Sequence, residues 1–279
     1  MTLLLALACG PDPSVGPADP VDPGEPGSAS YSANLGDEPD FTRATSTFAM
    51  DWWLAWEQAQ LTGSFSTEPM PSLRTEDALL GQCRLLTWEP STCGGVCNGW
   101  CVDGECLEYP ERYAEGDATW TWPDGAAMVT PDAGLSYFAV ADATTMGDSS
   151  LVFDDLSMTV PTVEPVSLTA ADPFSERARG EDVTLAWDNP VDGGRVRLFM
   201  TDCAGSHGGI GESEIECEGP DTGSLTLPGV FLDALEDGDW SRGECGSHTL
   251  ERYHAAASED GEVRLESAAP IYVFWFPGL

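Results

Sequence analysis

Five of the nine cysteines in the chain lie between Cys83 and Cys106, in the sequence CRLLTWEPSTCGGVCNGWCVDGEC. A loop so rich in glycine and cysteine has little apolar surface to bury, and covalent cross-links are expected to take the place of a core. Such clustering is typical of a chain that folds in an oxidising compartment. Cys9 stands apart, and the other eight could form four disulfides: Cys83, Cys93, Cys97, Cys101, Cys106, Cys203, Cys217 and Cys245.

The alternative for this cluster is a zinc site, but its spacing differs from the usual C-x2-C pairs, so disulfides are favoured. Sequence alone leaves the connectivity open. Because the cluster holds an odd number of cysteines, at least one bridge must reach the downstream group if all eight pair within one chain. The loop with its final CVDGEC resembles a small EGF-type knot. That resemblance implies the alternating pairs Cys93–Cys101 and Cys97–Cys106.

The N-terminal residues 1–9 resemble a bacterial lipoprotein signal, since the apolar run LLLALA directly precedes Cys9. The resemblance implies that Cys9 is lipidated and anchors the chain to a membrane. Gly10 follows the cysteine where an aspartate would favour retention at the inner membrane, so the likeness to Gram-negative lipoproteins implies an outer-membrane location in the cell envelope. No other segment approaches 18 consecutive apolar residues, the length that would suggest a spanning helix.

Residues 10–40 are dominated by Pro, Asp, Gly and Ser and contain almost nothing to bury. This composition predicts a disordered, extended linker that could hold a domain about 90 Å from a membrane surface. Residues 41–279 form the remaining, disulfide-bonded region, with the cysteine-rich loop 83–106 inside it. The sequence does not decide whether that region is one domain or two.

The charge of the chain is strongly negative, with 48 acidic residues against 11 basic ones and a net charge of −37. Such a surface repels phosphate backbones, which argues against nucleic-acid binding. Solubility is the simplest reason for the charge. Capture of a cation or of a basic partner is the alternative.

Alternating apolar residues predict the first strands of the folded region. Phe48, Met50, Trp52, Leu54 and Trp56 fall on alternate positions, and this pattern predicts two strands, roughly 42–53 and 57–66. Tryptophans at this spacing favour core packing over ligand stacking. Residues 67–79 are predicted to be a loop with a helical turn.

The rest of the chain shows short apolar runs between Gly, Pro and Asp. DNPVDGG has the composition of a hairpin loop, and DVTLAWDNPVDGGRVRLFM resembles an immunoglobulin or fibronectin-III hairpin. His248–His254 is expected to pair with residues 262–266, and residues 271–276 (IYVFWF) are expected to be buried on both faces. The predicted strands are 83–88, 118–122, 135–140, 150–153, 156–160, 166–169, 182–187, 195–201 and 224–227, with one helical turn at 230–235. This pattern predicts an all-β fold, an antiparallel Ig/fibronectin-III-like β-sandwich with a disulfide-rich loop insertion.

Motifs for catalysis are scarce. Of the three histidines, His207 lies in a glycine-rich loop, and no G-x-S-x-G elbow accompanies it. His248 and His254 would share a face of one strand. A metal pair there is conceivable, but ordinary exposed histidines are favoured. The acidic run 236–239 lacks the spacing of an EF-hand. We therefore assign no catalytic, cofactor or metal residue.

Several segments together resemble a group of uncharacterised, cysteine-containing lipoproteins of myxobacteria and their relatives. They are CRLL at 83–86, the cluster ending in VDGEC, VTLAW at 183–187 and the segment from His207 to Pro228. The resemblance implies a β-sandwich, export and lipidation, and no assigned activity. We expect a lipid-anchored envelope protein with a structural, binding or interaction role and a protein or glycan partner. A hydrolase using His207 or His248, or a calcium-dependent adhesion module, is the alternative.

Overall fold

The structure is a computed structural model. It describes residues 38–41, 44–53, 56–70, 72, 74–88, 93–97, 99–102, 104–170, 173–175, 177–201, 213–237 and 247–274. The predicted signal with Cys9, most of the predicted linker, and the side chains of Cys203, His207 and Cys245 lie outside these residues.

Strands account for most of the described residues, and the fold is all-β as predicted. The strands are β1 (Ser46–Trp53), β2 (Gln58–Ser66), β3 (Thr75–Leu80), β4 (Cys83–Thr87), β5 (Gly99–Val102), β6 (Glu105–Glu108), β7 (Arg112–Tyr113), β8 (Ala118–Trp122), β9 (Gly125–Val129), β10 (Ser136–Asp142), β11 (Asp148–Val152), β12 (Ser157–Pro161), β13 (Ser167–Leu168), β14 (Val183–Asp188), β15 (Arg195–Thr201), β16 (Ser213–Pro220), β17 (Ser224–Leu227), β18 (Ser247–Ala257) and β19 (Val263–Phe274). A helix, α1 (Gly229–Asp237), follows β17.

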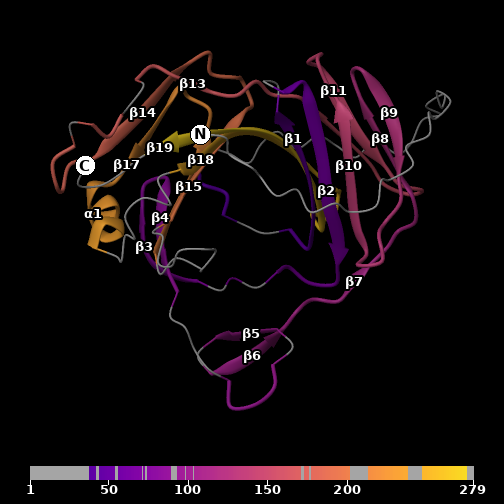
Figure 1. The fold of residues 1–279 in the computed structure, drawn as a ribbon, viewed down its shortest axis with the longest axis horizontal. Coiled ribbons are helices and arrows are strands. Elements are labelled where there is room, and N and C mark those ends of the chain that lie inside the picture. The colour runs from indigo at the N-terminus through magenta and orange to yellow at the C-terminus, as the bar shows by residue number, and fades with distance from the viewer. Residues whose placement is uncertain are drawn as a thin grey trace, which may run out of the picture.

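One long sheet organises the molecule. Its strand order is β10-β2-β1-β19-β18-β15-β16-β4-β3, with β7 paired to β2. In Figure 1 the sheet curves from β3 and β4 on the left, through β15, β18 and β19, to β2 and β10 on the right. All its pairings are antiparallel except that between β1 and β19, which is parallel. The expectation of a purely antiparallel sheet is therefore wrong at this pairing, because the first and last strands meet without a turn between them.

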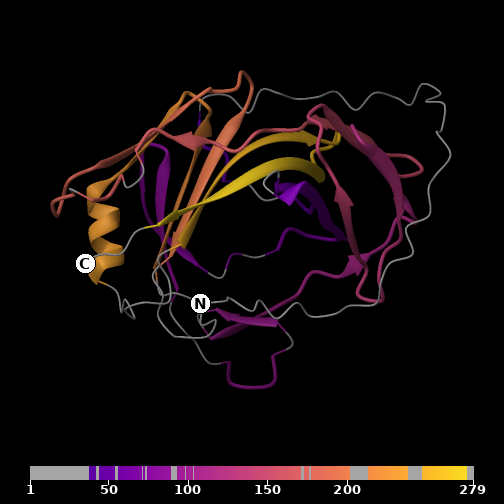
Figure 2. The same cartoon turned by 45° about the horizontal axis from the view of Figure 1, so that its top comes forward.

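Two smaller sheets cover the outside of the long sheet at separate places. The sheet β12-β11-β8-β9 packs on the β1–β2–β10 end, and the sheet β13-β14-β17 packs with α1 on the β15–β16–β4 end. Figure 2 shows β18 and β19 arching from one end to the other. Two hydrophobic cores result. Core 1 is centred on Phe48, Trp52 and Trp120, and core 2 on Leu185, Leu198 and Phe231.

A buried arginine separates the two cores. On one face of β18, Leu250 belongs to core 2 and Ala256 to core 1, and Arg252 lies between them at 2% exposure. Its guanidinium lies 2.7 Å from the carboxylate of Asp221 and donates to the carbonyl oxygens of Asn189 and Glu164 at 2.8 and 3.1 Å. A long cationic side chain thus fills the seam between the two cores.

The six described cysteines of the predicted disulfide set form three bridges. Cys83–Cys217 joins the cluster to the downstream group, and it ties neighbouring positions of β4 and β16. Cys93–Cys101 and Cys97–Cys106 close the loop around the small β5–β6 hairpin, which confirms the alternating pairs implied by the EGF-type likeness. Figure 1 places this hairpin apart from the sheets, at the lower end of the molecule.

The predicted hairpin between residues 182–187 and 195–201 is wrong. β14 pairs with β13 and β17 in a smaller sheet, whereas β15 pairs with β16 and β18 in the long sheet. Residues 189–194 therefore cross from one layer to the other. Asn189 takes a left-handed backbone with φ 61° at the start of this crossing, and its carbonyl oxygen accepts from Arg252.

Three further expectations differ from the structure. Residues 75–79 of the predicted loop belong to the edge strand β3, whose pairing with β4 is interrupted by a bulge. Residues 271–274 are the end of β19 rather than a separate strand, and Tyr272 is 54% exposed rather than buried. Trp56 follows the end of β1 and is 67% exposed, because the chain turns there at Glu57 with φ 54°. By contrast, Phe48, Met50 and Trp52 are fully buried as predicted.

Candidate binding face on the long sheet

The face of the long sheet turned away from both cores is called the inner face. Side chains alternate along each strand, so Asp51 and Trp53 on β1 lie on the inner face while Met50 and Trp52 point into core 1. On β15, Arg195 and Arg197 lie there while Leu198 points into core 2. Among the described residues, no strand or helix packs over this face.

Arginines and carboxylates form a ladder across the middle of the inner face. Arg197 on β15 pairs with Glu251 on β18 and with Glu266 on β19, the latter at 2.7 Å. Arg264, next on this face of β19, also pairs with Glu266 at 2.6 Å. Arg197 and Arg264 hold the pKa of Glu266 below its usual value against the opposing effect of burial. The pairs cross three strands and fix their side chains.

The ladder continues toward β16. Arg195 pairs with Glu218 at 2.7 Å, and the Tyr253 hydroxyl donates to the same carboxylate at 2.6 Å. Burial, followed by the negative charge of Glu218, raises the pKa of Tyr253 well above its usual value, so this hydroxyl stays protonated. At the next strand, Arg84 pairs with Glu216.

The segment 38–41 lies on this ladder. The Glu38 carbonyl accepts from Arg195 at 2.8 Å, and the Asp40 carboxylate accepts from Arg264 at 2.6 Å. The Asp40 amide donates to Glu218, and the Arg84 guanidinium lies 4.3 Å from the centre of the Phe41 ring. Residues 38–40, which the sequence places at the end of the linker, therefore make defined contacts, and the predicted linker joins the folded part at the inner face.

Among the described carboxyl groups of the inner face, Asp51 is the one whose pKa is most clearly raised. Burial, followed by the neighbouring charge of Glu251, raises its pKa to about 6, and Arg197 offsets part of this rise. The arginine is shared with Glu251 and Glu266, so it does not fully compensate a third carboxylate.

Beside Asp51, the inner face ends in aromatic side chains. Trp53 stacks between Trp56 and Tyr272, with ring centres 5.4 and 6.5 Å away. Two strands further on, Phe138 and Val140 of β10 are 49% and 44% exposed. This half of the inner face is thus largely apolar and open, whereas the half under residues 38–41 is charged and covered.

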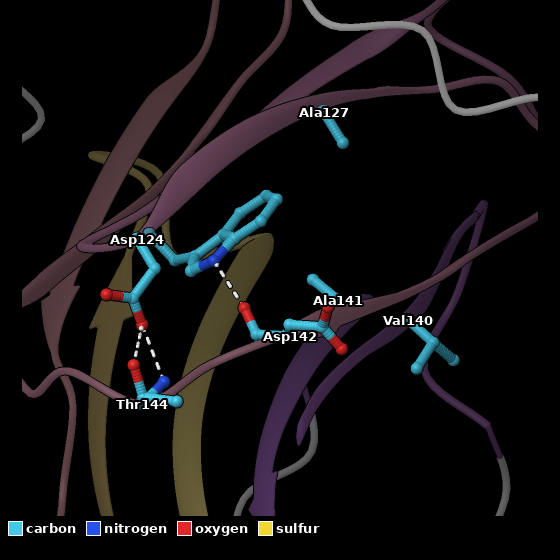
Figure 3. Close-up of a pocket in the computed structure, with 7 residues that line it drawn as sticks. Asp124, Ala127, Val140, Ala141, Asp142 and Thr144 are labelled. Atoms are coloured by element: carbon cyan, nitrogen blue, oxygen red, sulfur yellow. Dashed lines mark hydrogen bonds between the residues drawn. The ribbon is translucent and has the colours of Figure 1, made fainter. Parts of the chain in front are cut away.

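A pocket of about 450 Å³ lies elsewhere, between the edges of β9 and β10 (Figure 3). The Asp124 carboxylate and the Trp122 indole in this pocket are engaged. The Asp124 carboxylate accepts from the amides of Thr144 and Thr145 at 2.6 and 2.8 Å, and the Trp122 indole donates to the Asp142 carbonyl at 3.0 Å. These bonds close the open edge of the core 1 sandwich, and they leave the pocket few groups with which to recognise a ligand.

The two histidines of β18 do not make a surface site. His248 and His254 share a face of β18, as predicted, but they are 2% and 5% exposed, so the expectation of exposed histidines is wrong. Burial lowers the pKa of His248 to about 4 and also lowers that of His254. A hydrolase using His248 would have to open core 2. The other candidate, His207, lies outside the described residues.

The acidic run 236–239 begins in the last turn of α1, and its described residues pair with arginines. Arg177 pairs with Glu236 at 2.7 Å and with Asp233, and Arg179 pairs with Asp237. Elsewhere in the described residues, no group of three or more His, Cys, Asp or Glu side chains is placed to hold a metal ion. Within the same part of the chain, no helix has the length and apolar character needed to cross a membrane.

Comparison with known proteins adds no relationship: no protein-family model matches the chain, and no curated protein matches it. Function must therefore be argued from the inner face. Sequence reasoning missed this face because its residues come from strands that lie far apart in the chain. The exposed side of β1 was visible as the positions that alternate with the predicted core, but nothing in the sequence joined it to Tyr272.

Proposed function

We propose that this chain is a lipid-anchored binding protein of the cell envelope, exposed at the outer membrane, in which two Ig/fibronectin-III-like β-sandwiches present the inner face to a partner. The apolar run before Cys9 and the Pro/Asp/Gly-rich composition of the predicted linker support the anchor. The three disulfides among the described residues support folding outside the reducing cytoplasm.

One observation carries the binding role. The inner face combines side chains fixed by ion pairs with aromatic side chains that remain open, notably Trp56 at 67% exposure. A fixed framework lowers the entropy cost of binding, and large aromatic groups are the residues that most often dominate binding energy. The outside of the long sheet offers no equivalent, since the smaller sheets cover it.

The anchor is tested by metabolic labelling with radioactive palmitate in a Gram-negative host. We expect label in the wild-type protein and none in Cys9→Ala, with the wild-type protein in the outer-membrane fraction. Equal labelling of the two proteins would contradict the anchor.

The binding face is tested by oxidative footprinting of the protein in intact cells and after purification. We expect Trp56 and Tyr272 to be less oxidised in cells than in the purified protein. Met128 on β9 is 59% exposed and lies on the outer sheet, so its oxidation should be equal in both samples. If Trp56, Tyr272 and Met128 are each oxidised to the same extent in cells and in the purified protein, the inner face has no partner in cells.

A further inference from the structure

The aromatic end of the inner face presents stacked rings to solvent. Trp53 and Trp56 stack at an interplanar angle of 20°, and Trp53 and Tyr272 at 27°, so the three rings are close to parallel. Trp56 and Tyr272 are 67% and 54% exposed. We call Trp53, Trp56 and Tyr272 the aromatic platform. Rings this exposed contribute little to a core, and a face of Trp56 is available for stacking.

Hydrogen-bonding side chains lie beside the platform on the same face. Gln58 of β2 pairs with the position of Trp53, and Gln60 pairs with that of Asp51. On the far side of β2, the positions of Gln60 and Thr62 pair with Val140 and Phe138 of β10. Amide and carboxyl groups thus lie between two apolar areas, an arrangement suited to a ligand with apolar faces and polar edges.

The charge near the platform argues against an anionic ligand. Glu251 and Glu266 are paired with Arg197, and burial, followed by Glu251, raises the pKa of Asp51 to about 6. Glu57, which follows Trp56, and Asp142, whose position pairs with that of Gln58, are exposed carboxyl groups, so a cation is the alternative that the test must distinguish. An anionic ligand would meet a protein of net charge −37.

We infer that the aromatic platform binds a neutral glycan, with a pyranose ring stacked on Trp56 and hydroxyl groups bonded to Gln58, Gln60 and Asp51. Sugar rings have C–H faces that pack on aromatic side chains and hydroxyl edges that need donors and acceptors. This inference rests on the proposed function, because it names the partner of the inner face. It requires no change in the fold, since β1, β2 and β19 already hold the side chains in register.

The inference is tested by isothermal titration of the full chain in detergent with neutral hexasaccharides: cello-, xylo-, malto- and chitohexaose. Heparin fragments and choline serve as anionic and cationic probes. We expect at least one neutral hexasaccharide to bind, and the Trp56→Ala variant to lose at least tenfold in affinity. The matched control is Met128→Ala, an exposed apolar residue on the outer sheet, which should leave affinity unchanged.

The outcomes separate the two proposals. Failure of all four neutral hexasaccharides to bind, equal binding by Trp56→Ala, or binding of choline in their place would overturn the glycan inference. If Trp56 and Tyr272 are still protected from oxidation in cells, the binding role of the inner face stands with another partner. If they are not protected and no sugar binds, both proposals fail.

Discussion

At the scale of single residues, four arginines of the inner face form ion pairs with five carboxylates. The described part of the ladder uses Arg84, Arg195, Arg197 and Arg264 to hold Glu216, Glu218, Glu251, Glu266 and Asp40. Removing one partner of such a buried pair typically costs about 3–5 kcal/mol, because the other charge is left without compensation. The positive charge of these arginines does not fully compensate the negative charge of the Asp51 carboxylate.

Asp51→Asn is expected to stabilise the protein at pH 8 by about 1–3 kcal/mol. The folded state raises the pKa of Asp51 from 3.8 to about 6, so the folded protein binds this proton more tightly than the unfolded chain does. Ionised Asp51 therefore destabilises the fold above pH 6. The gain should shrink as the pH falls from 6 to 4 and vanish below that.

The measurement is urea unfolding of both proteins between pH 4 and pH 8. The exposed Asp188→Asn variant controls for the loss of one charge and should show no comparable gain at pH 8. A stability difference for Asp51→Asn that does not change with pH would refute the assignment.

Gly63→Ala is expected to destabilise the protein by about 1–3 kcal/mol, as overpacking of a core does. Gly63 on β2 lies opposite Phe48, and a Cβ atom there would come within 2.2 Å of the buried Phe48 ring. Gly95→Ala is the control, since nothing lies within 4 Å of the added atom. Thermal melts of the two variants should differ clearly; equal melting temperatures would show that Phe48 can move at little cost.

At the scale of elements, sequence patterns predict strands well and their partners poorly. β4, β8, β15 and β17 match their predicted ranges closely, because alternation depends on neighbours in the chain. Residues 189–194 have a hairpin composition, yet burial of Trp187 in core 2 places β14 in another layer from β15. Turn residues permit a hairpin, but packing far along the chain decides whether one forms.

The aromatic platform of the candidate site was also beyond what the sequence pattern could predict. Trp56 continues the alternation of Phe48, Met50 and Trp52, so the pattern assigned it to the core. The left-handed Glu57 ends the alternation, and a non-glycine residue in that conformation is uncommon enough to escape prediction. The disulfide arithmetic succeeded because it depends on counts and not on geometry.

The Cys83–Cys217 bridge is expected to matter more for global stability than the bridges of the β5–β6 loop. It spans 134 residues and is buried between β4 and β16, whereas Cys93–Cys101 spans eight. Replacing both Cys83 and Cys217 by Ala should cost about 2–5 kcal/mol. The Cys93/Cys101 double variant is the control in the same urea titration. A larger loss for the control would contradict this ranking.

At the scale of the whole molecule, the two cores should unfold together. They share β18 and β19, which carry Leu250 and Val273 into core 2 and Ala256 and Leu265 into core 1. Pulsed hydrogen-exchange mass spectrometry across a urea series should give one midpoint for β8 of core 1 and β14 of core 2. Two separated midpoints would mean that the sandwiches are independent domains.

Arg252→Met tests the seam between the cores. The substitution leaves Asp221 buried without its cation and is expected to cost about 3–5 kcal/mol. Arg112→Met is the control, because that exposed side chain donates to Ser136 and should contribute less than 1 kcal/mol by comparison with typical surface contacts. Equal midpoints of chemical unfolding for the two variants would show that Arg252 does not stabilise the seam.

The parallel pairing of β1 with β19 has a consequence for how the chain assembles. Ser46 pairs with Val263, so one of the central contacts of the long sheet joins residues more than two hundred positions apart. Contacts between residues so far apart in the sequence slow folding, since a large loop must close before they form. Until the last strand arrives, one edge of β1 is an unpaired template for other chains. A newly synthesised molecule should therefore be most prone to aggregation after its β1–β2 hairpin has formed and before β19 is in place, which is the interval in which a chaperone would help most.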